Sequence, residues 1–107
     1  LPQQTRDFVT AFSGHNALLL TQTLAPMEKW KRDALAEILQ SWMELTEEAL
    51  ACRIGGVHAG SLARTMAEGR SSMELMEAAR ILRKALDYTR SNVSPAAVCG
   101  WLQWALR

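Results

Sequence analysis

The chain has 107 residues and carries 12 lysines and arginines against 11 aspartates and glutamates, a formal net charge of +1. A balance this close to neutrality creates no long-range field that would draw the chain to nucleic acid or to an anionic membrane. The longest run of large aliphatic residues, 18–20, is far shorter than the ~20 apolar residues of a membrane-spanning helix. The length predicts one domain over residues 1–107, and the sequence shows no signal-peptide pattern. We expect a cytoplasmic location.

The N-terminal third predicts two short helices separated by a glycine. Apolar residues recur at helical spacing within residues 5–13, and Gly14 ends this segment. A second short helix is expected over residues 17–24, with His15 or Asn16 at its start.

The longest helical pattern covers residues 26–54, and the rest of the chain is expected to pack around it. Pro26 suits the first helical position, where no backbone N–H is needed, and Gly55 and Gly56 supply a C-terminal stop. The apolar positions form a set too broad for a coiled-coil seam, which predicts a helix covered on more than one side, with Trp42 in the core. The polar positions expected to face water are Lys29, Lys31, Arg32, Glu37, Gln40, Glu44, Glu47 and Glu48.

Two further helices are expected in the C-terminal half. The first is short and covers residues 62–68. A capping box, Ser71 with Glu74 three residues later, then opens a second long helix that extends to about Arg90. Its core-facing positions are expected to be Met73, Met76, Ala79, Leu82, Ala85 and Leu86, with Leu75, Ile81 and Tyr88 widening the stripe.

A break and a cap precede the last helix. Asn92 lies in the break, Ser94 is placed to cap, and Pro95 suits the first position of a helix that runs through Leu106. No segment shows the alternation of a strand. The sequence therefore predicts an all-α fold, a compact orthogonal bundle of about six helices.

The chemistry-bearing residues predict no catalytic, cofactor or metal site. Cys52 and Cys99 are expected to be buried free thiols in a reducing compartment, with a disulfide between them as the alternative. No tight cysteine or histidine pair has the spacing of a zinc site. No nucleophile elbow, phosphate loop or dinucleotide fingerprint occurs. We therefore expect that this domain is not an enzyme.

Two surface features suggest binding. Arg80, Arg83, Lys84 and Arg90 form a basic row on the second long helix, which a DNA-binding module would use for phosphate contacts. A solvated helix face has the same pattern and is the simpler explanation.

The last helix is apolar around most of its circumference, so either its own core or a partner must cover it. Tryptophan is enriched among interface hot spots, although core packing explains a buried one equally well. The candidate subunit interface consists of Val98, Trp101, Leu102, Trp104 and Ala105.

The segment 82–106, LRKALDYTRSNVSPAAVCGWLQWAL, resembles the C-terminal end of the delta-prime subunit of the bacterial DNA polymerase III clamp loader. In that family a similar helix ends in an Asn-Val-Asn-Pro type of break, with Ser94 here in place of the second asparagine. Residues 35–56 are similar to the family's long helix and its Gly-Gly stop. The related gamma/tau subunit has a similar terminal domain. Gly100 stands where the family commonly has glutamate, and Trp101 and Trp104 replace leucines.

The resemblance implies a clamp-loader collar domain, which is the C-terminal part of a longer protein. In that family five such domains associate into a ring, while separate ATPase-type domains act on the sliding clamp and on primed DNA. The expected partners are therefore the gamma/tau and delta subunits in a hetero-oligomer within the DNA polymerase III holoenzyme. This domain itself would be non-catalytic, would hold no cofactor or metal, and would meet DNA only through the full complex.

Overall fold

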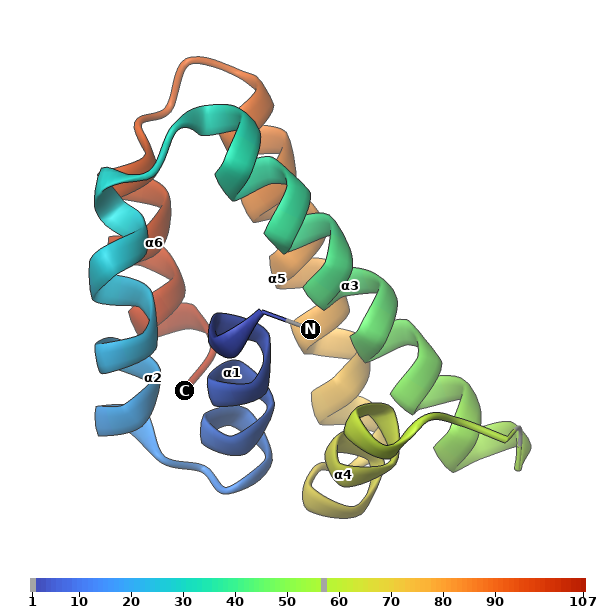
Figure 1. The fold of residues 1–107 in the computed structure, drawn as a ribbon. Helices are drawn as coiled ribbons and strands as arrows, with labels where there is room; N and C mark the ends of the chain where they lie inside the picture. Colours follow the sequence, from blue (N-terminus) through green and yellow to red (C-terminus); the bar gives the residue numbers. More distant parts are fainter. Residues whose placement is uncertain (1, 57) are drawn as a thin grey trace.

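The computed structural model describes residues 2–56 and 58–107, which fold into six α-helices and one 3-10 helix (Figure 1). In chain order the elements are α1 (Gln3–Ser13), α2 (Ala17–Leu24), η1 (Ala25–Lys29), α3 (Arg32–Gly55), α4 (Ser61–Gly69), α5 (Ser72–Arg90) and α6 (Pro95–Ala105). The radius of gyration is 12.8 Å, close to the ~13 Å expected for a compact chain of this length. The predicted all-α fold with about six helices is confirmed, and no strand occurs in the described ranges.

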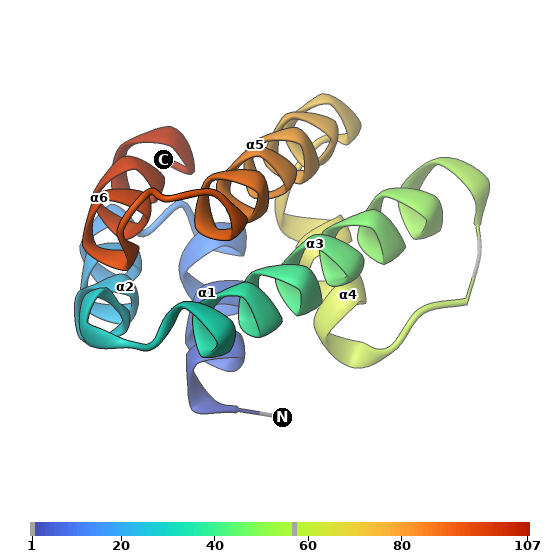
Figure 2. The ribbon, with the colours of Figure 1, turned by 90° about the horizontal axis from the view of Figure 1, so that it is seen from above.

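The helices form two antiparallel pairs with α1 between them. The long helices α3 and α5 lie side by side and share the largest contact in the molecule, while α2 packs on α6 (Figures 1 and 2). Helix α1 contacts α2 on one side and α4 on the other. None of the helices in the described ranges has the length and apolar character needed to cross a membrane.

The centre of the core is Trp42, on α3, as the sequence predicts. Its ring is fully buried and stacks on Phe8 with 4.2 Å between ring centroids and 6° between planes. Its indole Nε1–H donates to the hydroxyl oxygen of Thr5 at 3.1 Å. The buried indole N–H therefore has a hydrogen-bond partner, as nearly all buried polar groups in proteins do. The same hydrogen bond links α3 to α1.

The central helix starts later than predicted. Pro26 lies in the 3-10 helix η1, Trp30 is extended with ψ 155°, and α3 begins only at Arg32. Met27 is fully buried, so apolar positions continue through the turn and periodicity alone does not reveal the break. The end of α3 is as predicted, because Gly56 adopts φ 63°, the left-handed conformation of a helix C-cap.

The sequence predicted that Arg32 faces water, and this prediction is wrong. The side chain is half-buried, and its Nη1 donates to the backbone carbonyl oxygens of Thr89 at 3.1 Å, Ser91 at 2.9 Å and Val93 at 2.7 Å. Carbonyls at a helix C-terminus lack partners within the helix. Arg32 supplies those partners and so fixes the turn between α5 and α6.

Both predicted caps of the last two helices are present. The hydroxyl of Ser71 accepts from the backbone N–H of Glu74, whose carboxylate in turn accepts from the backbone N–H of Ser71. Ser94 Oγ accepts from the N–H of Ala97 at 3.1 Å, and Pro95 is the first residue of α6.

The prediction for the buried face of α5 is partly wrong. Met73 and Met76 are 81% and 58% exposed. The prediction is confirmed for Leu82, Ala85 and Leu86, which are buried, and Ala79 is half-buried. Leu75, which was expected to widen the stripe, is buried as well, and Ala78 and Thr89 complete the buried face. Two apolar stripes overlap on this helix, and the stripe that carries the three leucines packs on the core. The two methionines are left on the surface, and Met73 lines a hollow together with Ala105 of α6.

Candidate protein-interaction surface

Helix α6 is a surface helix without a single charged residue (PAAVCGWLQWA). Exposed positions of such helices are ordinarily charged or polar. Here the exposed positions are Ala96, Ala97, Gly100 and Trp104, and the Trp104 side chain is 70% exposed. Apolar surface of this kind marks an interaction site when it forms a continuous patch.

The structure divides the five predicted interface residues into two groups. Val98 and Leu102 are buried in the core of this chain, so they hold α6 in place and cannot contact a partner directly. Trp101 and Ala105 are half-buried, and Trp101 meets the ring of Tyr88 edge-on at 5.6 Å between centroids. Trp104 alone of the five is largely free to touch another molecule.

A groove follows the junction of α5 and α6 and connects Met73 to the two tryptophans of α6. We call it the α5–α6 groove and define it by Met73, Glu77, Ile81, Trp101, Trp104 and Ala105. Its two hollows measure about 350 Å³ at the tryptophan end and about 250 Å³ at the Met73 end, and both are lined by Glu77, Ile81 and Ala105. Apolar side chains of both helices therefore line the two hollows, with charged side chains of α5 along them.

Gly100 lies in the middle of α6, at a position where no contact within this chain requires a glycine. A Cβ placed there meets no atom within 4 Å, and its φ is not positive. Glycine at such a position costs about 0.5–1 kcal/mol relative to alanine. A helix surface without a side chain at this position allows another protein element to approach closely. Such an approach explains the glycine, whereas the fold of this chain alone does not.

The predicted basic row on α5 is partly neutralised. Arg80 donates to Glu77 at 2.7 Å and Arg83 donates to Glu47 at 3.0 Å. For Lys84 and Arg90 the described part of the chain shows no ion pair. Two of the four cations therefore already have a carboxylate partner.

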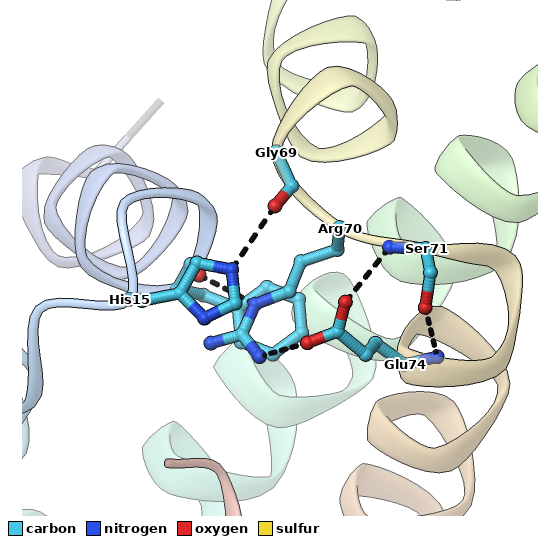
Figure 3. A network of polar contacts seen from close by, with 6 residues as sticks. His15, Gly69, Arg70, Ser71 and Glu74 are labelled. Atoms are coloured by element: carbon cyan, nitrogen blue, oxygen red, sulfur yellow. Dashed lines mark hydrogen bonds and ion pairs between the residues drawn. The ribbon is translucent and has the colours of Figure 1, made fainter.

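Sequence reasoning missed a buried arginine, Arg70, which lies in a network of polar contacts (Figure 3). It also lines the Met73 end of the groove. Arg70 is only 6% exposed. Its Nε donates to the carbonyl oxygen of Phe12 at 2.7 Å, its Nη1 donates to Glu74 at 2.7 Å, and its guanidinium lies 4.1 Å from the centroid of the Phe12 ring. The residue ties α1 to the start of α5. Its only sequence signal is its position between Gly69 and the capping box.

The carboxylate of Glu74 belongs to the same network. The backbone N–H of Ser71 and then the guanidinium of Arg70 lower the pKa of Glu74 from 4.5 to about 2. Because the pKa is lower in the folded state than in the unfolded state, this carboxylate stabilises the fold above pH 4.5. That contribution is lost as the pH falls toward 2.

We expect Glu74→Gln to lower stability at neutral pH and to flatten the loss of stability between pH 4.5 and 2. Glutamine retains a capping oxygen but cannot pair with Arg70 as a charge. Urea unfolding of both proteins across this pH range measures the difference. Glu77→Gln is the control, because its pair with Arg80 is solvent-exposed and is expected to contribute little to stability. Parallel pH profiles of Glu74→Gln and the unsubstituted chain would contradict the expectation.

The two cysteines and His15 are accounted for by packing and by hydrogen bonding. Cys52 and Cys99 are free thiols, and burial raises the pKa of Cys99 to about 12, so its thiol stays neutral and packs as an apolar group. His15 Nε2 lies 3.2 Å from the carbonyl oxygen of Gly69 (Figure 3), and Asn16 caps α2. Within residues 2–56 and 58–107, no three histidine, cysteine, aspartate or glutamate side chains come together as metal ligands.

Together these features define a class: an all-helical domain with one uncharged, tryptophan-bearing face beside an apolar groove. The chain matches no protein-family model, no curated protein and no solved structure. Any more particular assignment therefore depends on the motifs of residues 35–56 and 82–106 and on the chemistry of this face.

Proposed function

We propose that this chain is a non-catalytic assembly domain of the clamp-loader collar type, similar to that of the delta-prime subunit. The observation that carries the proposal is the uncharged helix α6, with a 70% exposed tryptophan beside the α5–α6 groove. The Asn92–Pro95 break, in which Ser94 caps α6, adds support from the sequence.

In the proposed mechanism, a neighbouring subunit buries the exposed apolar side chains of α5 and α6. Specific interfaces bury about 1,600 Å² in total, and most of their energy comes from a few central residues. Trp104 has the size and position of such a residue. The buried anchors Val98 and Leu102 keep α6 rigid, so the contact sets the relative geometry of the domains attached to each subunit.

A DNA-binding module is the weaker candidate. Phosphate contacts need free cations, and Arg80 and Arg83 are both paired with carboxylates. We expect no salt-sensitive binding of duplex or single-stranded DNA by this chain at low ionic strength. Tight binding that weakens steeply with added salt would favour the DNA-binding module instead.

The proposal is tested by mixing this chain with the collar domains of gamma/tau and delta subunits from the same organism. Analytical ultracentrifugation is expected to show a discrete hetero-oligomer that neither partner forms alone. Trp104→Ala is expected to dissociate it. A chain that sediments as the same species with and without both partners would contradict the collar assignment.

A further inference from the structure

The tryptophan end of the α5–α6 groove has an asymmetric charge pattern. Its α6 wall carries no charged residue, whereas its α5 wall places Arg80 and Lys84 along the rim. Arg80 is held by Glu77, but Lys84 has no ion pair in the part of the chain that the structure describes. At its tryptophan end the groove thus combines apolar side chains from both helices with an available positive charge on the α5 side.

We propose that this groove binds an amphipathic helix of a partner protein, and that a carboxylate on one edge of that helix pairs with Lys84. The inference rests on the proposed function, since both require the face formed by α5 and α6 to be an interface. It adds to the proposed function the secondary structure and the charge of the partner segment that fills the groove.

The groove favours a helix over an extended peptide. An extended peptide obtains affinity from main-chain hydrogen bonds to a sheet edge, and the described residues contain no strand. Both walls of the groove are helices, whose own backbone groups are already paired. A helix satisfies its backbone internally and inserts only side chains. From Met73 to Lys84 the α5 wall extends ~17 Å at ~1.5 Å per residue, which accommodates a partner helix of about 11 residues.

The charges argue against two other occupants. A single nucleic-acid strand stacks bases on exposed aromatic rings but needs cations along its backbone, and the carboxylate of Glu77 lies in the groove. The residues that line the groove of a second copy bring no unpaired carboxylate to Lys84, since its Glu74 is held by Arg70. Its α6 has none, and its Glu77 is paired with Arg80.

The test uses two labelled 12-residue helical peptides with the same three leucines on one face. One carries glutamates and the other lysines at a single edge of that face. Fluorescence anisotropy with this chain is expected to show about fivefold tighter binding of the glutamate peptide. Lys84→Glu is expected to abolish or reverse that preference, and Trp104→Ala to weaken both peptides about tenfold or more. Arg6→Glu, which alters an exposed cation outside the groove lining, is the matched control and is expected to change nothing.

Several results would overturn the inference. These are no binding of either peptide, a preference that survives Lys84→Glu, displacement of the peptide by an oligothymidylate, and self-association of the chain through Trp104 in sedimentation. The outcome also separates this inference from the proposed function. A chain that joins the collar domains but ignores the peptides refutes only the helix-binding groove. A chain that binds the glutamate peptide but ignores the collar domains refutes only the clamp-loader assignment.

Discussion

Replacing Trp42 by alanine is expected to lower the free energy of unfolding by about 3–5 kcal/mol, the range for large aromatic residues removed from a core. The fully buried ring stacks on Phe8 at 4.2 Å, and its N–H is the partner of the Thr5 hydroxyl. The substitution leaves a cavity at the junction of α1 and α3 and an unpaired buried hydroxyl. Urea unfolding followed by circular dichroism measures the loss.

The two contributions of Trp42 can be separated. Thr5→Val removes the hydrogen-bond acceptor while keeping the shape, and leaves the indole N–H unpaired at a cost of about 1–3 kcal/mol. Trp104→Ala serves as the control, because a largely exposed side chain is expected to change stability by no more than about 0.5 kcal/mol. Equal losses for Trp42→Ala and Trp104→Ala would show that α1 does not pack on α3 as described.

Local signals in the sequence predicted the helices well. Asn16, Ser71 and Ser94 are caps whose partners lie within three residues along the chain, and Gly56 ends α3 through its own backbone conformation. Such interactions depend only on neighbours in the sequence. For the same reason the helix boundaries in the C-terminal half differ little from expectation.

Contacts between distant residues were not predictable in the same way. Arg32 bonds to carbonyl groups 57–61 residues away, and Arg70 bonds to Phe12 across 58 residues. Both arginines look like ordinary surface cations in the sequence. Their burial depends on which helix ends meet in the fold, and hydrophobic periodicity contains no information about that.

The candidate interface was likewise predicted only in part from the sequence. The sequence identified α6 as too apolar for a free surface helix, but it grouped Val98 and Leu102 with Trp104. A helix of about three turns with apolar residues on every side does not show which side its own core covers. The groove was missed because the sequence placed Met73 and Met76 in the core, whereas they are exposed.

Substitutions at Gly100 are expected to move stability and assembly in opposite directions. Gly100→Ala should raise the free energy of unfolding by about 0.5–1 kcal/mol, because the added methyl group meets no atom of this chain and alanine is the better helix former. If a neighbouring subunit packs closely on α6, the same methyl group collides with it and weakens the hetero-oligomer, and Gly100→Leu weakens it further. Thermal unfolding and sedimentation with the collar domains measure the two effects.

Trp104→Ala is the reference variant for the assembly measurement. It is expected to weaken the hetero-oligomer by about 2 kcal/mol or more, which is a roughly 30-fold loss of affinity. Ile54→Ala is its matched control, since Ile54 is similarly exposed at 68% but lies near the far end of α3. A chain that Gly100→Ala stabilises, and that still assembles as before, would place the interface elsewhere. If Gly100→Ala instead raises stability but weakens assembly, this glycine, which is unfavourable in the isolated domain, is explained by the partner that covers it.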